Sequence, residues 1–273
     1  MQKINFTKMV ASGNDFVVVD ANQFCRYKQN ISSLAKKICN RRLGIGADGL
    51  LLMEGSKKAD IKMRIFNADG SEADMCGNGA RSASYWYSEN KGRGIKEIDI
   101  ETKAGIIESK ITGSSVRIKL TSPKGLKLNI PVNFNKRALR VNFINTGVPH
   151  TVIFVNGLED IDVEELGRYI RFHKVFSPEG TNVNFVEPLG KGFISVRTYE
   201  RGVEAETLAC GTGSVASALI TAYTLKAQGS GMIRVKTKSK EVLKVYFNKD
   251  SFLFNNIWLE GCVKKVYKGE YYV

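Results

Sequence analysis

The chain contains the same short segment twice, and each copy leads into an apolar stretch. The first copy is Met75-Cys76-Gly77-Asn78-Gly79, and the second, 134 residues further on, is Ala209-Cys210-Gly211-Thr212-Gly213. The residues that follow, 80–89 and 215–225, have helical character. Glycine lets main-chain N–H groups approach a ligand closely. Because the first N–H groups of a helix lack partners within it, each segment predicts an anion-binding site beside a thiol.

The start of a helix also favours the ionised form of a cysteine. The partial positive charge there lowers the pKa of a thiol below its usual value of about 8.5. A lone cysteine at such a position is more often a small buried residue than a base. The repetition favours the functional interpretation for Cys76 and Cys210. The other three cysteines, Cys25, Cys39 and Cys262, lack the Cys-Gly-x-Gly pattern and are expected to be structural.

Further features recur at nearly the same interval and indicate a duplicated unit. Residues 98–103 are echoed by residues 233–238. An amphipathic helix followed by an alternating strand precedes each cysteine segment, at 32–41 with 61–67 and at 162–172 with 193–200. The most economical interpretation is two copies of one unit. We expect a hinge between them at residues 121–135, which include Pro123, Gly125 and Pro131.

Most of the remaining chain alternates between apolar and polar residues, which is typical of half-buried antiparallel strands. Such stretches lie at 16–20, 97–102, 106–111, 116–121, 151–155, 183–187, 242–247 and 257–260. Residues 215–223 carry no charge and predict a helix that is buried on all sides and wrapped by the curved sheet of its own half.

The expected fold class is α+β, with two similar halves related by a pseudo-twofold axis. Each half is a mainly antiparallel curved sheet rolled around a central buried helix. The first half is expected to span residues 1–122, with the C-terminal strand 264–273 returning to it. The second half is expected to span residues 123–263.

Two thiols on opposite sides of a cleft allow one particular kind of chemistry. If the helix starts of the two halves face each other, one thiol lies on each wall. Inverting a carbon centre requires a base on one face and an acid on the other, and a thiolate with a thiol supplies both. The two helix N-termini stabilise the charge that develops on an adjacent carboxylate without a cofactor.

At this point the chain resembles the diaminopimelate epimerase family, whose members belong to the cofactor-independent amino-acid racemases and epimerases. The matching segments run from end to end: Phe6-Thr7-Lys8-Met9, Gly13-Asn14-Asp15-Phe16, Arg41 with Gly44-Ile45-Gly46-Ala47-Asp48, Asn67 to Glu72, Met75 to Arg81, Gly147 with Pro149-His150, Gly180 to Val183, Glu200-Arg201-Gly202, and Glu206 to Gly213. Asn78 between the glycines is typical of this family, whereas the related proline racemases carry a histidine there.

The resemblance implies interconversion of LL- and meso-diaminopimelate in lysine and peptidoglycan synthesis, with no pyridoxal phosphate or metal cofactor. It assigns the acid/base roles to Cys76 and Cys210, with His150 and Glu200 tuning the thiols or polarising the reacting centre. Main-chain groups at four positions would bind the reacting carboxylate: Gly77, Asn78, Gly211 and Thr212. Five side chains would hold the substrate's amino and carboxyl groups: Asn14, Asn67, Asn182, Glu200 and Arg201.

The chain departs from the family pattern in three places. Gly49 follows Asp48 where many members have glutamine, and Val148 stands where asparagine is common, with Asn145 nearby as a substitute. The segment 202–209 is one residue longer than usual. These differences affect contacts to the far end of the substrate more than the reacting carbon.

Three alternatives remain open on the sequence. A racemase or epimerase of proline or hydroxyproline would share the two thiols. A redox protein would pair Cys76 and Cys210 in a reversible disulfide. The net charge of +14 invites nucleic-acid binding, but the basic residues are dispersed among acidic and apolar ones, as on solvated strands. The run Gly44 to Gly49 fits G-x-G-x-x-G but precedes a strand rather than a helix, so it does not indicate dinucleotide binding.

The expected partner is a small-molecule substrate rather than nucleic acid or a membrane, and a homodimer is one option for an oligomeric state left open. No stretch reaches the roughly 18 apolar residues of a membrane span. The N-terminus lacks an apolar signal region, so we expect a cytoplasmic protein. Five cysteines without a C-x-x-C pair, and only two histidines, favour neither a disulfide framework nor a zinc site.

Overall fold

The chain forms two compact units. The computed structural model describes residues 3–24, 30–91, 94–135, 137–251 and 253–272. The first unit comprises residues 1–118 and 261–273, and the second comprises residues 119–260. The last strand, β17 (Leu253–Tyr272), therefore begins in the second unit and ends in the first.

The sheet of the first unit closes on itself. Its elements are β1 (Lys3–Ala11), β2 (Asn14–Asp20), α1 (Ile31–Cys39), β3 (Gly49–Glu54), β4 (Ile61–Asn67), β5 (Glu72–Ala73), α2 (Gly77–Lys91), β6 (Glu97–Thr102), β7 (Gly105–Thr112) and β8 (Ser115–Leu120). The strands pair in the order β17-β1-β2-β3-β4-β6-β7-β8, and β8 pairs again with β17. The pairs β2–β3 and β4–β6 are parallel.

The sheet of the second unit has a corresponding order of strands. Its elements are β9 (Lys124–Phe134), β10 (Arg137–Asn145), β11 (Pro149–Phe154), α3 (Val163–Arg171), β12 (Asn182–Gly190), β13 (Phe193–Glu200), β14 (Ala205–Thr207), α4 (Gly211–Thr224), β15 (Gly229–Lys236), β16 (Val242–Asp250) and the first part of β17. The strands pair in the order β9-β10-β11-β12-β13-β15-β16-β17, with β11–β12 and β13–β15 parallel.

The order of elements is nearly the same in both units. After an antiparallel strand pair (β1–β2 or β10–β11), each has a short 3₁₀ turn, a helix, two strands, a short strand, a second helix and three strands. The second unit adds β9 before the pair and a further 3₁₀ turn after α3. The parallel pairs correspond as well, since β2–β3 matches β11–β12 and β4–β6 matches β13–β15. This agreement supports a duplication. The α+β class is confirmed, while the pseudo-twofold axis and the boundaries of the halves stay predictions.

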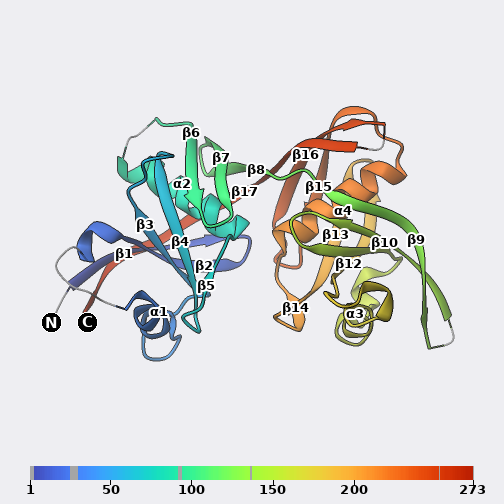
Figure 1. Cartoon of the computed structure of the whole chain (residues 1–273), viewed down its shortest axis with the longest axis horizontal. Coiled ribbons are helices and arrows are strands. Elements are labelled where there is room, and N and C mark those ends of the chain that lie inside the picture. Colours follow the sequence, from blue (N-terminus) through green and yellow to red (C-terminus); the bar gives the residue numbers. More distant parts are fainter. Residues whose placement is uncertain (1–2, 25–29, 92–93, 136, 252, 273) are drawn as a thin grey trace. The chain divides into compact units, whose positions relative to one another are not determined.

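One helix in each unit is surrounded by strands. α2 contacts β1, β2, β3, β4, β6 and β7, and α4 contacts β10, β11, β12, β13, β15 and β16, whereas α1 and α3 lie at the outside of their own units (Figure 1). Every residue of α4 from Gly213 to Ala222 is buried, as its uncharged sequence predicts. None of the described helices is long and apolar enough to cross a membrane.

The predicted hinge at residues 121–135 is wrong. Most of it is the strand β9, which pairs antiparallel with β10. Pro131 of β9 lies opposite Arg140 of β10. Among the described residues, β10 is the one strand that pairs with β9. Proline is tolerated on such a strand because its missing N–H removes no bond to a second neighbour. Left-handed backbone at Gly125 and Asn129 accompanies shifts in register, so the turn-forming residues bend the strand rather than end it.

Candidate active site

Cys76 and Cys210 occupy equivalent positions at the starts of the two buried helices. The sulfur of Cys76 accepts the N–H of Gly79 at 3.4 Å, and the sulfur of Cys210 accepts the N–H of Gly213 at the same distance. The carbonyl of each cysteine accepts the first helical bond, from Ala80 at 2.8 Å or from Ser214 at 2.9 Å. Each sulfur thus takes the place of an N-cap oxygen, where the helix dipole stabilises negative charge.

The glycines after each cysteine let other groups approach closely. A Cβ at Gly79 would lie 3.3 Å from side-chain atoms of Ile65 and Leu51. A Cβ at Gly213 would overlap the side-chain oxygen of Asn184 and lie 3.3 Å from the Cys210 sulfur. The helix starts are therefore packed so tightly that larger residues would displace the sulfur or its neighbours.

In the first unit, two asparagines are joined in a hydrogen-bonded row beside Cys76. Buried Asn78 donates from Nδ2 to Asn14 Oδ1 at 2.5 Å. Arg81, fully buried one turn further along α2, donates to Asn78 Oδ1 and to Ser12 Oγ, both at 2.6 Å. These bonds fix which way each amide faces, with the nitrogen of Asn14 directed away from Asn78.

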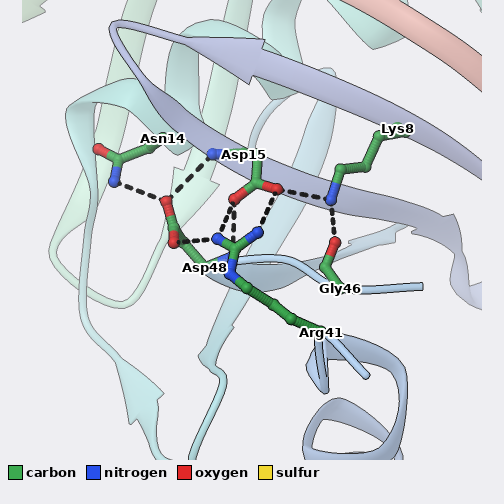
Figure 2. Close-up of polar contacts among 6 residues, drawn as sticks. All are labelled: Lys8, Asn14, Asp15, Arg41, Gly46 and Asp48. Carbon is green, nitrogen blue, oxygen red and sulfur yellow. Dashed lines mark hydrogen bonds and ion pairs between the residues drawn. The ribbon is translucent and has the colours of Figure 1, made fainter. Parts of the chain in front are cut away.

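A charged cluster holds Asn14 from the other side (Figure 2). Asn14 Nδ2 donates to Asp48 Oδ2 at 3.0 Å, and Arg41 bridges Asp48 and Asp15, each at 2.7 Å. Buried Lys8 pairs with Asp15 at 2.7 Å and also donates to the carbonyl of Gly46. Burial would raise the pKa of Asp15, but the bonds from Arg41 and Lys8 outweigh it and hold the pKa below its usual range.

Asn67 lies apart from this row. It ends β4 with an exposed side chain, and its Nδ2 donates to Ser71 Oγ at 3.0 Å within the turn that leads to β5. Gly70, in the same turn, has a φ of +82°. The structure therefore places Asn67 in the turn that delivers the chain to Cys76, without a hydrogen bond to Asn14 or Asn78.

In the second unit, His150 and Thr212 connect β11 to the sulfur of Cys210. His150 is fully buried, and its Nε2 lies 2.9 Å from Thr212 Oγ1. Thr212 Oγ1 lies 3.5 Å from the sulfur of Cys210, which is itself 8 % exposed. Burial, and secondarily the charge of Arg201, lowers the pKa of His150 to about 3. The imidazole is therefore neutral at physiological pH.

Three further predicted residues meet where β12 begins and β13 ends. The N–H of Arg201 donates to Asn182 Oδ1 at 2.9 Å, and Asn182 Nδ2 donates to the carbonyl of Pro149 at 2.9 Å. The guanidinium of Arg201 donates to the carbonyl of Glu179 at 3.0 Å. Burial raises the pKa of the neighbouring Glu200 above its usual range. Such a carboxyl can exchange a proton nearer neutrality than an exposed one.

Comparison with known proteins agrees with these motifs. A family model described as diaminopimelate epimerase matches residues 6–124 and 142–252, which include both cysteine segments. A diaminopimelate epimerase of Hydrogenobaculum sp. (strain Y04AAS1) is 43% identical over 274 residues, covering 96% of each chain. One of Aquifex aeolicus (strain VF5) is 41% identical over 279 residues, covering 97% of each.

The chain belongs to the diaminopimelate epimerase family. The resemblance to this family that the motifs indicate is thereby confirmed, as is the prediction that the chain is an isomerase of the epimerase type.

Solved structures outside the diaminopimelate epimerase family share the fold. A PhzF-family phenazine biosynthesis protein of Bacillus anthracis superposes with a TM-score of 0.76 at 20% identity, over 100% of both chains. A hydroxyproline epimerase of Agrobacterium vitis superposes with a TM-score of 0.70 at 12% identity, over 99% of this chain and 91% of that one. At such identities the likeness concerns the fold alone.

The structure shows the surroundings of the three places where the sequence is expected to depart from the diaminopimelate epimerase pattern. A Cβ at Gly49 would lie 2.9 Å from the carbonyl of Phe66, so a side chain there would require a local shift. Asn145 accepts the N–H of Gly147 at 3.0 Å, which engages its oxygen in the turn before Val148. The segment expected to be one residue longer includes the β13–β14 turn, where Glu204 has a φ of +58°.

Two of the three remaining cysteines lie among the described residues. Cys39, the last residue of α1, is buried, and burial raises the pKa of its thiol to about 11. This supports a structural role. Cys262 is exposed on β17, and Cys25 lies outside the described residues.

Asn184 belongs to the site but is not part of the sequence motifs. It lies in β12 two residues after Asn182, is fully buried, and bonds to the residues around His150. The signal was available, because an asparagine inside the run Val183 to Val186 is an unexpected polar group in a buried strand. Its partner was not predictable, because the contact depends on how β11 and β12 pair.

Proposed function

We propose that this chain interconverts LL- and meso-diaminopimelate by acid/base catalysis with two cysteines. The observation that carries the proposal is the repeated N-cap geometry. In a member of the diaminopimelate epimerase family, each unit presents one cysteine whose sulfur accepts a helix N–H at 3.4 Å. A thiolate is stabilised at either position, so either sulfur can serve as base while the other serves as acid.

The two epimerase halves of this mechanism are the predicted ones, residues 1–122 with 264–273 and residues 123–263, whose bounds lie within a few residues of those of the two compact units. One sulfur removes the α-proton from one face of the substrate carbon and the other delivers a proton to the opposite face. The negative charge that develops on the adjacent carboxylate is stabilised by helix N–H groups at four positions: Gly77, Asn78, Gly211 and Thr212.

The remaining polar residues bind the substrate's charged groups. Arg201 grips a carboxylate and Glu200 takes an ammonium group. Asn14, Asn67 and Asn182 offer both donors and acceptors. The amide orientations fixed by Asp48 and Arg81 support this role for Asn14, since a pre-oriented amide needs no rearrangement when substrate binds. His150, which is neutral, and Glu200 tune the thiols or polarise the reacting centre.

No pyridoxal phosphate or metal takes part in the proposed reaction. Its product would serve lysine and peptidoglycan synthesis, and the reduced state that the two thiols require fits a cytoplasmic location.

The test is substrate turnover by the purified chain under reducing conditions. Chiral chromatography should show LL-diaminopimelate and meso-diaminopimelate each converting to the same mixture, without added cofactor. L-proline and trans-4-hydroxy-L-proline should remain unchanged, because Asn78 replaces the histidine of proline racemases. Conversion of either proline and not of diaminopimelate would contradict the proposal, and so would full activity after complete oxidation of both thiols.

A further inference from the structure

We propose that Asn184 fixes the tautomer of His150 and thereby directs the hydroxyl hydrogen of Thr212 at the sulfur of Cys210. Asn184 would be a positioning residue, since it acts through His150 and Thr212 rather than on substrate. The proposal rests on the proposed function only in treating Cys210 as a working acid or base.

The orientation of the Asn184 amide follows from its partners. Its Nδ2 lies 2.9 Å from the main-chain carbonyl of Thr151, which can only accept a hydrogen bond. Its Oδ1 accepts the hydroxyl of Thr198 at 3.0 Å. The amide nitrogen must therefore face β11, and its second hydrogen is available to His150.

This second hydrogen decides where the imidazole carries its proton. Asn184 Nδ2 lies 3.2 Å from His150 Nδ1, so Nδ1 must accept and the ring proton must lie on Nε2. A protonated imidazole would place two N–H groups against each other at this contact. The lowered pKa of His150 agrees with the arrangement, and the charge of Arg201 acts in the same direction.

The tautomer then sets the direction of the next bond. With its proton on Nε2, His150 donates to Thr212 Oγ1 at 2.9 Å. The hydroxyl hydrogen of Thr212 is left to point toward Cys210 Sγ, 3.5 Å away. This hydrogen bond adds to the one that the sulfur accepts from the Gly213 N–H. Two donors favour the thiolate more than one does.

The packing around Gly213 keeps Asn184 in place. A Cβ on residue 213 would overlap Asn184 Oδ1, so glycine is required for the amide to reach both β11 and β13. The first unit carries different side chains at the matching positions. Asn78 occupies the position of Thr212 and donates to Asn14, and both histidines of the sequence lie in the second unit.

The tautomer can be read directly from the ring nitrogens. The experiment uses protein labelled with ¹⁵N-histidine and lacking the second histidine through His173→Gln. We expect a neutral His150 protonated on Nε2 between pH 6 and 8, and in Asn184→Asp a ring protonated on Nδ1, because a carboxylate accepts where the amide donated. A proton on Nδ1 in the parent protein, or an unchanged tautomer in Asn184→Asp, would overturn the proposal.

The effect on the sulfur can be measured without substrate. The pH dependence of iodoacetamide alkylation, followed for each cysteine peptide by mass spectrometry, reports the pKa of Cys210, with Cys76 of the same molecule as internal control. Thr212→Val and Asn184→Asp should reduce the thiolate fraction of Cys210 at neutral pH by about ten-fold, because one donor is lost. Thr212→Ser, which keeps the hydroxyl, should restore it.

Thr198→Val is the matched control, because it removes the other hydrogen bond of Asn184 and leaves the chain to Cys210 intact. It should change stability but leave the Cys210 profile where it was. An unchanged Cys210 profile in Thr212→Val would refute the proposal even if Asn184→Asp fails to fold. Equal shifts of Cys76 and Cys210 would refute it as well. The tautomer of His150 and the alkylation profile of Cys210 can both be measured even if the protein does not turn over diaminopimelate. Failure of this proposal can therefore be distinguished from failure of the proposed function.

Discussion

Cys76 and Cys210 accept the same helix hydrogen bond but have different neighbours. In the first unit, the amides beside the cysteine are held by charged residues, Arg81 on one side and the Asp48–Arg41–Asp15 cluster on the other. In the second unit, the sulfur lies next to the hydroxyl of Thr212, which in turn contacts the neutral imidazole of His150. A single structural repeat thus carries different side chains beside its two cysteines.

The charged cluster makes stability depend on pH. Because the folded-state pKa of Asp15 is depressed, its contribution is fully present above the ordinary aspartate pKa of about 4 and is lost as pH falls toward the lower folded value. Asp15→Asn should therefore lower the free energy of unfolding at pH 7 by about 1–2 kcal/mol. The difference from the parent protein should shrink below pH 4.

Urea titrations at pH 7, 5, 4 and 3 measure this difference. Asp74→Asn is the control, because the side chain of Asp74 is 77% exposed and its loss should cost little at any pH. A constant difference between Asp15→Asn and the parent protein across this range would show that the ionised carboxylate is not what stabilises the cluster.

At the scale of residues, the sequence predicts groups that repeat or belong to a motif. Cys76 and Cys210 could be found because the same segment occurs twice. Asn184 could not be assigned a partner, since its contact with His150 depends on the parallel pairing that places β11 beside β12. The bonds of Lys8 and Arg41 to Asp15 likewise join three segments whose proximity only the fold creates.

Among the elements, alternation located most strands, and apolar runs located the buried helices. β4, β6 and β13 have the predicted limits, because each alternates over most of its length and is bounded by polar or turn residues. β9 was not predicted because Pro131 and Gly125 usually interrupt strands, whereas a strand with one partner among the described residues accommodates both. The predicted stretches 257–260 and 264–273 belong to one strand, β17, as far as Tyr272.

The helix α3 offers a test of side-chain capping. Asp162 Oδ1 accepts the N–H of Glu165 at 2.9 Å, ahead of an acidic first turn. Asp162→Ala should lower the free energy of unfolding by about 1 kcal/mol. Asp162→Asn keeps an acceptor and should stay close to the parent protein in the same urea titration. Equal losses in both variants would point to charge rather than capping as the source of stability.

For the whole molecule, β17 makes the first unit depend on the end of the chain. Its last part pairs antiparallel with β1 from Lys3↔Tyr272 to Ala11↔Val263, and the ring of Tyr267 packs edge-on against Phe6 at 5.8 Å. The sequence analysis predicts that strand 264–273 returns to the first half, but its pairing with β1 joins the two ends of the sequence and follows only from the fold.

Removal of residues 264–273 should therefore destabilise the first unit selectively. Hydrogen exchange followed by mass spectrometry should show faster exchange in β1 and β2, because β1 loses a partner strand, while β11 and β12 of the second unit keep their protection. Unchanged protection of β1 would mean that the pairing with β17 contributes little. Equal loss in both units would mean that they unfold together.

The central claim is that two different sulfurs act on opposite faces of one carbon, and solvent deuterium tests it most directly. LL-diaminopimelate is incubated with the protein in deuterated water. After a small extent of reaction the isomers are separated, and the deuterium content of each is measured by mass spectrometry. We expect each new meso molecule to carry one deuterium while the remaining LL substrate keeps its proton, since the sulfur that donates has exchanged with solvent. Cys76→Ala and Cys210→Ala should each lose conversion by at least about 10²–10⁴-fold. Product that retains the original proton, or sustained conversion by either variant, would contradict the account.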